Sequence, residues 1–225
     1  MDRCGALHLH SGREACRPMD GERVVDFYYS IGSRYSYLAS TQIAKLERET
    51  GSRVRWHPVN GPDIRRLRGR DPFAGEPLSG QYEWSYRRYD AECWADYYGV
   101  PFREPTTPHF DFRLLVKAAT AAKQLGAVVP YSHALFRAVW VEGVWPLDED
   151  VCRQAAVSVG LSPDDFERAF VDPATDDELR NTAAEAHRRG AFGVPTFFVG
   201  DRMFWGNDRL VLVRHYLMTL GAEGG

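Results

Sequence analysis

Segments that favour β-strands lie near the two ends of this chain, and a long helical region separates them. β-Branched and aromatic residues dominate residues 23–31 (RVVDFYYSI) and 53–59 (RVRWHPV). The next such segments are 194–200 (VPTFFVG) and 203–206 (MFWG), separated by a two-residue turn typical of a hairpin. A sheet that uses all four must bring the two ends of the chain together.

A single helix is expected between the first two strands. Ser33 stands at its N-cap position, apolar residues recur at helical spacing, and Gly51 marks its end. A strand, a helix and a second strand in this order form a βαβ unit, in which the strands run parallel.

The middle of the chain reads as helical. Residues 62–80 are rich in Gly, Pro and Arg and favour a loop or broken helix. Helices are then expected at 81–99, 112–126, 130–143, 148–160, 162–173 and 175–190. Asp148, Ser162 and Thr175 fit N-caps. The last helix of the chain is expected to begin at Asn207 or Asp208.

This pattern predicts an α/β fold in which a helical subdomain interrupts a small sheet domain. Residues 1–22 are expected to be a disordered extension. The sheet domain comprises residues 23–61 and 191–225, and the inserted helices occupy residues 62–190.

Composition excludes several classes of function. The 28 basic and 31 acidic residues give a net charge of −3, which argues against non-specific binding to nucleic acid or an anionic membrane. No apolar run is long enough to span a bilayer. The four cysteines show neither a Cys-x-x-Cys motif nor the spacing of a metal site, so no metal is expected and a reducing cytoplasm is the simplest location.

The turn after the first strand reads Ser33-Arg34-Tyr35-Ser36, where proteins with thiol redox chemistry carry Cys-x-x-Cys. A serine cannot form a disulfide. At a helix N-terminus its hydroxyl can instead donate a hydrogen bond to a thiolate brought by a ligand, and the helix dipole adds to that stabilisation. The alternative is that Ser33 is only a helix cap.

Three motifs together resemble the 2-hydroxychromene-2-carboxylate isomerase family, which is related to kappa-class glutathione transferases. They are DFYYSIGSRYSYLA at 26–39, YRRYDAECWADYYGVPFREP at 86–105 and FGVPTFFVGDRMFWGNDRL at 192–210. The resemblance spans about residues 24–220 and implies a thioredoxin-like fold with a large helical insertion, of the DsbA and kappa-class type.

The resemblance also implies a bound cofactor, glutathione or another low-molecular-weight thiol. Ser33 is the expected catalytic residue, which stabilises the thiolate. The residues expected to bind the cofactor are Val194, Pro195, Asn207, Asp208 and Arg65. Pro195 is expected to be cis, so that the backbone of Val194 pairs with the cysteinyl part of the thiol. Asn207 and Asp208 hold its γ-glutamyl end, and Arg65 replaces a family lysine.

The implied substrate is a small aromatic or conjugated carboxylate. The residues expected to bind it are Tyr35, Tyr86, Tyr89, Asp90, Trp205 and Arg34. An aromatic stripe on a helix can equally belong to the core, and an arginine can simply be solvated. The sequence departs from the family pattern at Arg34, Arg70 and Cys93, which stand where proline, asparagine and arginine are usual.

The leading hypothesis is therefore a thiol-dependent isomerase of 2-hydroxychromene-2-carboxylate or a related acid. Three alternatives stay open: a kappa-like glutathione transferase, a cis–trans isomerase of a polyene or cinnamoyl intermediate, and a non-catalytic DsbA-like binding protein. A homodimer is also expected.

Overall fold

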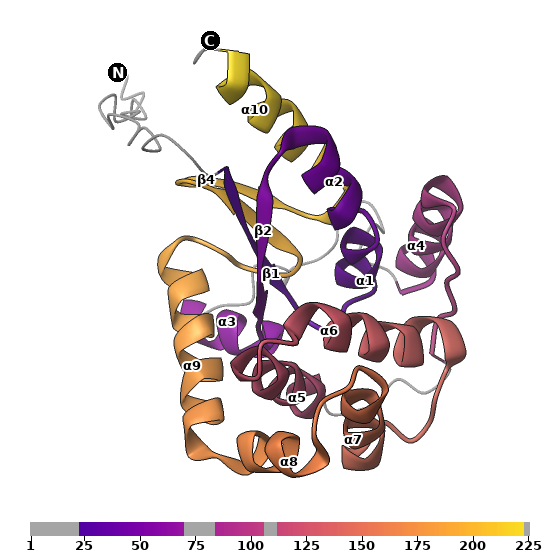
Figure 1. Cartoon of the computed structure of the whole chain (residues 1–225). Helices are drawn as coiled ribbons and strands as arrows, with labels where there is room; N and C mark the ends of the chain where they lie inside the picture. Colours follow the sequence, from indigo (N-terminus) through magenta and orange to yellow (C-terminus); the bar gives the residue numbers. More distant parts are fainter. Residues whose placement is uncertain (1–22, 70–83, 106–111, 223–225) are drawn as a thin grey trace, which may run out of the picture.

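The computed structural model describes residues 23–69, 84–105 and 112–222. The predicted extension of residues 1–22 lies outside them, as does Arg70. Four strands form one sheet in the order β2-β1-β3-β4. They are β1 (Val24–Tyr29), β2 (Arg53–Pro58), β3 (Thr196–Val199) and β4 (Arg202–Trp205). β1 runs parallel to β2 and antiparallel to β3, so the two ends of the chain meet at β1 (Figure 1).

The helices surround this sheet, and α3 to α9 lie in the sequence between β2 and β3 (Figure 1). They are α1 (Arg34–Ser40), α2 (Ile43–Thr50), α3 (Gly61–Arg68), α4 (Trp84–Tyr98), α5 (Phe112–Gln124), α6 (Val128–Arg137), the π-helical turn η1 (Ala138–Glu142), α7 (Glu149–Ser158), α8 (Pro163–Val171), α9 (Pro173–Arg188), the 3₁₀ turn η2 (Asn207–Arg209) and α10 (Leu210–Ala222). None of the helices within the described residues is long and apolar enough to cross a membrane.

Two helix starts differ from those predicted. Asp172, not Thr175, caps α9: its carboxylate accepts a hydrogen bond from the N–H of Ala174, while Thr175 is buried inside the first turn. The last α-helix begins at Leu210, because residues 207–209 form a 3₁₀ turn first.

The helix expected after Ser33 is also divided, with a short turn between α1 and α2, although it ends at Gly51 as predicted. The caps predicted at Asp148 and Ser162 are confirmed by their side-chain hydrogen bonds to backbone N–H groups.

One face of the sheet carries an aromatic core. Phe27 of β1 stacks on Phe197 of β3 at 4.9 Å between ring centroids, and its edge meets Trp56 of β2. The Tyr29 hydroxyl lies 2.6 Å from Ser132 Oγ in α6, which satisfies a polar group that would otherwise be buried without a partner. Burial of these large rings anchors the inserted helices to the sheet.

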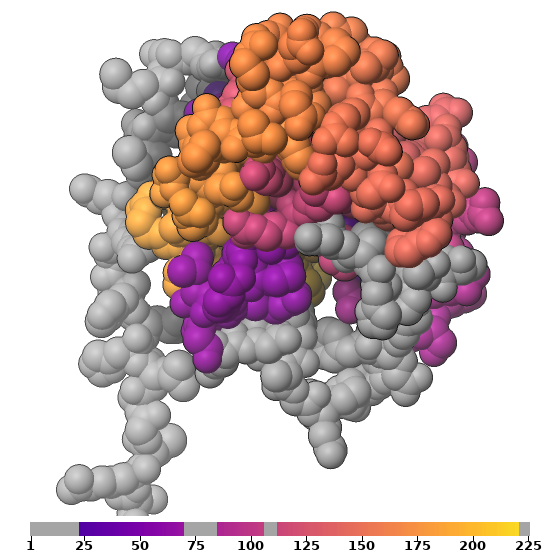
Figure 2. Space-filling model, turned by 90° about the horizontal axis from the view of Figure 1, so that it is seen from below, coloured from indigo at the N-terminus to yellow at the C-terminus, as the bar shows by residue number. Residues whose placement is uncertain are grey.

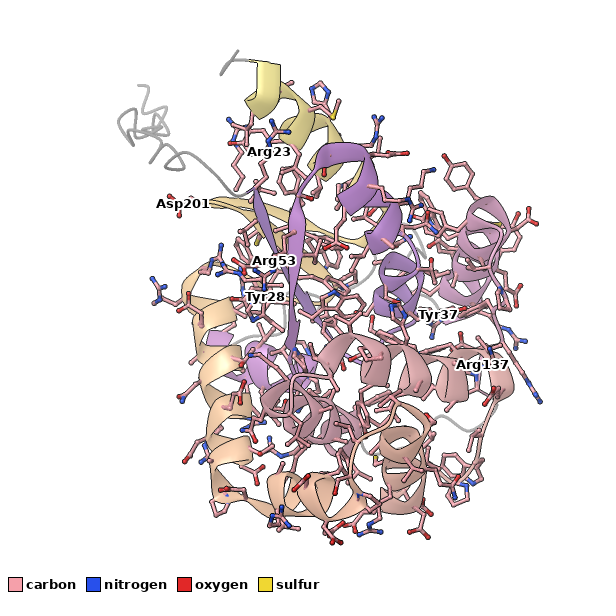
Figure 3. All side chains as sticks on the ribbon, in the orientation of Figure 1. Arg23, Tyr28, Tyr37, Arg53, Arg137 and Asp201 are labelled. Atoms are coloured by element: carbon pink, nitrogen blue, oxygen red, sulfur yellow. The ribbon has the colours of Figure 1, made fainter. Side chains whose placement is uncertain are left out.

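The other face of the sheet packs against α3 and α9. Phe198 and Ile64 lie beside Ala183 and Ala186, whose small side chains allow α9 to approach the strands closely. Tyr28 points to this side of the strands, whereas Tyr37 lies on the side of α1 and α6 (Figure 3). The position of a residue along β1 therefore decides which helices it contacts.

On this second face, the buried carboxylate of Asp26 connects three parts of the chain. Asp26 of β1 accepts hydrogen bonds from Arg55 Nε, His57 Nε2 and Arg189 Nη1, each at 2.8 Å. Burial alone would raise the pKa of Asp26, but hydrogen bonds from His57, Arg55 and Arg189 outweigh that effect and hold its pKa well below the usual range. Asp26 thereby links β1 to β2 and to the residue that follows α9.

The Asp26 cluster gives a pH-dependent prediction. Because the pKa of Asp26 is lower in the folded state, its stabilising contribution is present above the unfolded-state pKa of about 4 and is lost as the pH falls below that value. Asp26→Asn should lower the free energy of unfolding by about 3 kcal/mol at neutral pH, measured by urea denaturation. The difference from the wild type should shrink at about pH 3.

Asp201→Asn is the matched control, because Asp201 is an exposed acid in the turn between β3 and β4 (Figure 3). It should change the stability little at either pH. If Asp26→Asn lowers the free energy of unfolding by the same amount at both pH values, the stabilisation does not come from the ionised carboxylate of Asp26.

Candidate functional site

The site is built around the turn between β1 and α1. Ser33 N–H donates to Ser30 O at 3.0 Å, and Ser36 N–H donates to Ser33 Oγ at 3.2 Å, so the predicted cap is confirmed. The hydroxyl hydrogen of Ser33 has no acceptor among the described residues. A capping serine can therefore still donate a hydrogen bond to an anion placed at the N-terminus of α1.

The side chain after the serine is buried rather than open to a cavity. The Arg34 guanidinium pairs with the carboxylate of Glu104 at 2.8 Å, and both side chains are about 5 % exposed or less. Burial raises the pKa of Glu104, although the charge of Arg34 acts in the opposite direction. The pair fixes α1 to the segment after α4, and the expected contact between Arg34 and a substrate stays a prediction.

The second part of the site is the loop before β3. The peptide bond between Val194 and Pro195 is cis. Tyr28 pairs with Thr196, and continuing this register by two residues sets Val194 opposite Ser30. Within the described residues, neither the N–H nor the C=O of Val194 has a hydrogen-bond partner. Val194 therefore presents a short free strand edge close to the Ser33 turn.

The third part is the turn after β4. Gly206 N–H donates to Pro195 O at 2.9 Å, and the same register sets Asn207 beside Val194. Asn207 is only 3 % exposed, and its Nδ2 has no partner among the described residues. Asp208 forms an ion pair with Arg209 at 2.9 Å. A buried amide donor without a partner is unusual and indicates a polar ligand.

Helix α3 brings positive charge to the Val194 loop. A Cβ placed on Gly61 would lie 3.7 Å from the Val194 side chain, so the start of α3 contacts this loop. Arg65 is partly buried and has no ion-pair partner within the described residues. Figure 2 shows α3 on the surface of the molecule next to α9. The residue type and position of Arg65 suit a ligand carboxylate.

Trp205, at the end of β4, packs against Phe192, which precedes the Val194 loop. Phe192 was not among the site residues predicted from the sequence. The two ring centroids lie 4.9 Å apart, and the guanidinium of Arg68 lies 5.6 Å from the Phe192 ring centroid. Phe192 is the one aromatic residue in the stretch 188–195, and a single aromatic residue before a strand usually belongs to the core, so the sequence gave no reason to select it.

The aromatic residues expected in the substrate slot come from α1, from α4 and from the end of β4. Tyr35 donates to Asp90 Oδ2 at 2.8 Å, which joins α1 to α4. Burial and this hydrogen bond raise the pKa of Tyr35, so its hydroxyl stays protonated at neutral pH. Tyr86 and Tyr89 are 51 % and 63 % exposed on the outside of α4. Their proposed roles in substrate binding, and that of Trp205, stay predictions.

Phe112 is a further residue at the serine turn that the sequence did not reveal. A Cβ on Gly32 would overlap the ring of Phe112, which comes from the first turn of α5. Gly32 is therefore required by a close contact, and Phe112 forms an apolar wall next to Ser33. Such a contact joins residues far apart in the sequence, so no local pattern predicts it.

Comparison with known proteins identifies the family of folds to which the chain belongs. Residues 24–218 match the family model described as the DSBA-like thioredoxin domain. The chain belongs to this family.

Within this class, the chain is similar to a particular group of proteins. It is 31 % identical over 197 residues to 2-hydroxychromene-2-carboxylate isomerase of Sphingobium xenophagum, covering 87 % of this chain and 98 % of that protein. A solved structure of a 2-hydroxychromene-2-carboxylate isomerase superposes with a TM-score of 0.77 at 27 % identity, covering 89 % and 97 % of the two chains. Human glutathione S-transferase kappa 1 is 24 % identical, covering 87 % and 91 %. The resemblance stated from the sequence is confirmed.

The contact between Gly32 and Phe112 can be tested by a double-mutant cycle. Gly32→Ala should lower the free energy of unfolding by about 1–3 kcal/mol, because the new methyl group forces the Phe112 ring out of its position. In a Phe112→Ala background the same change should cost less than about 0.5 kcal/mol. Urea unfolding of the four proteins gives the coupling, and equal costs in both backgrounds would disprove the contact.

Proposed function

We propose that the protein is an isomerase that uses glutathione, or another small thiol, to act on 2-hydroxychromene-2-carboxylate or a related aromatic or conjugated acid. The observation that carries the proposal is the Ser33 hydroxyl at the N-terminus of α1, next to the free backbone edge of Val194. Relatives named as isomerases and as a kappa-class transferase support an enzymatic function.

The residues present fit a thiol peptide. The backbone N–H and C=O of Val194 are free to pair with the cysteinyl residue as an added strand would. The Nδ2 of Asn207 and the carboxylate of Asp208 suit the carboxylate and ammonium of the γ-glutamyl end. Arg65, without an ion-pair partner in the described part of the chain, suits the glycine carboxylate.

The chain's own contribution to the reaction is positioning and charge stabilisation. The cofactor supplies reversible thiolate addition, which turns a double bond of the substrate into a single bond that can rotate. Ser33 donates its hydroxyl hydrogen to the thiolate, and the positive end of α1 adds to this effect. Phe112 keeps water from one side of the turn.

On the substrate side, Tyr35, Asp90 and Trp205 are the residues placed near the bound acid. The hydrogen bond from Tyr35 to Asp90 fixes both groups at the junction of α1 and α4. The expected homodimer and cytoplasmic location are also retained as predictions.

A kappa-like glutathione transferase is the second candidate, because the human kappa transferase matches across 87 % of this chain. The two activities differ in what happens to the thiol. An isomerase uses the thiol catalytically, whereas a transferase consumes one thiol for each molecule of product. Counting the free thiol during turnover with an aromatic halide and with a chromene carboxylate distinguishes them.

The role of Ser33 can be separated from its role as a cap. Ser33→Ala should cost about 1 kcal/mol of stability and reduce turnover at least about 100-fold, because the thiolate loses a preorganised donor. Ser162→Ala is the matched control, since Ser162 caps α8 in the same way far along the chain. It should cost a similar amount of stability and leave turnover and glutathione affinity unchanged.

The measurements are glutathione titration calorimetry, urea unfolding and steady-state isomerisation of the chromene carboxylate. If both serine variants lose stability equally and neither loses thiol binding or turnover, then Ser33 is only a helix cap and the proposed function falls.

A further inference from the structure

A groove lies between α2, α4 and the η2–α10 segment, and Ser33 is not among its lining residues. Its volume is about 860 Å³, within the range of small-molecule sites. Figure 1 shows α2, α4 and α10 on the same side of the molecule. The lining residues that matter most for a ligand are Lys45, Glu49, Trp94, Tyr98, Asn207 and Val211.

The groove is distinct from the proposed reaction centre. The wall formed by α2 starts at the N-cap residue Gln42, which follows the C-terminal end of α1. Helix α1 contains seven residues, so Ser33 lies roughly 10 Å along that helix from the end next to Gln42. Asn207 and Asp208 line the groove and also belong to the proposed thiol site. A ligand held in the groove therefore does not need to reach the Ser33 hydroxyl.

The walls of the groove favour a flat apolar group. Trp94 and Tyr98 lie with their ring centroids 5.3 Å apart, and Leu46 and Leu210 supply buried aliphatic surface. Val211 is 66 % exposed at the rim. Aromatic side chains next to an open apolar surface bind ring systems by stacking and by removing apolar area from water.

The charges of the groove favour an anion. Glu49 is paired with Arg214 at 2.5 Å, and Asp208 is paired with Arg209 at 2.9 Å. Lys45 is exposed and has no ion-pair partner within the described residues. After these pairings the ammonium of Lys45 is the charge left without compensation among the lining residues, so the groove complements a carboxylate.

A second polar group points to the same class of ligand. Asn207 lines the groove, is 3 % exposed, and has a buried Nδ2 without a partner in the described part of the chain. An amide NH₂ carries two hydrogens, so one can serve the groove while the other serves the thiol site. Its position indicates an acceptor oxygen on the ligand.

We propose that this groove binds an aromatic carboxylate at a second site, separate from the thiol reaction at Ser33. The ring packs against Trp94 and Tyr98, and the carboxylate lies between Lys45 and Asn207. The inference does not require the proposed isomerase activity, because the groove and its unpaired donors exist without a bound thiol.

The test uses 2-naphthoate as the probe, with 2-naphthol as its uncharged counterpart, and measures quenching of tryptophan fluorescence and calorimetric binding. The wild-type protein should bind naphthoate more tightly than naphthol. Lys45→Met should weaken naphthoate binding about five-fold and leave naphthol binding unchanged, because only the charge is removed. Arg48→Met is the control, since Arg48 is exposed on the same helix but does not line the groove.

A second pair of variants keeps the test independent of Lys45. Val211→Glu places a negative charge at the rim and should weaken naphthoate binding at least about ten-fold, whereas Leu212→Glu, at an exposed position outside the lining, should not. Naphthoate affinity that is unchanged in both Lys45→Met and Val211→Glu would overturn the proposal.

Addition of glutathione separates this proposal from the proposed function. Naphthoate should remain bound at saturating glutathione if the two sites are distinct, and competitive displacement would show a single site and overturn the inference. If glutathione fails to bind at all, the thiol-dependent function falls, while the naphthoate measurements still decide the groove.

Discussion

The pairing of β1 with two strands from opposite ends of the chain is the constraint on which the site depends. β1 lies between β2, which follows it in sequence, and β3, which begins about 140 residues after the end of β2. Antiparallel pairing with β3 sets the Val194 loop opposite the end of β1, where the chain turns into α1. The backbone hydrogen bonds between β1 and β3 therefore bring Ser33 and the backbone edge of Val194 together without help from side chains.

The two faces of the sheet hold different parts of the structure in place. Phe27 and Tyr29 point to the inserted helices, which carry Phe112 to the serine turn. Asp26 and Tyr28 point to the other face, where the carboxylate of Asp26 binds Arg189 at the end of α9, the last element before the Val194 loop. Because successive residues of a β-strand point to opposite faces, β1 alone contacts the inserted helices on one face and the end of α9 on the other.

Much of the secondary structure could be predicted from local sequence patterns. The features that could not be predicted depend on contacts between residues far apart in the sequence. The strands, the caps at Asp148 and Ser162 and the helix stop at Gly51 follow from residue preferences within a few positions, and the family resemblance supplied the topology. Thr175 was a wrong cap because Asp172 followed by Pro173 competes better for the helix start. The Arg34–Glu104 pair, the Gly32–Phe112 contact and the groove along α4 depend on tertiary packing, which no local window contains.

The departure from the family pattern at Arg34 illustrates how burial changes the meaning of a charged residue. A free arginine after the serine would add positive charge to the thiol site. Paired with Glu104 in a buried position, it contributes a nearly neutral unit, and its field at Ser33 is small compared with an exposed cation at the same distance. The stabilisation proposed for the thiolate then rests on the Ser33 hydroxyl and the N-terminus of α1, with Arg65 on α3 the cation suited to the carboxylate of the ligand.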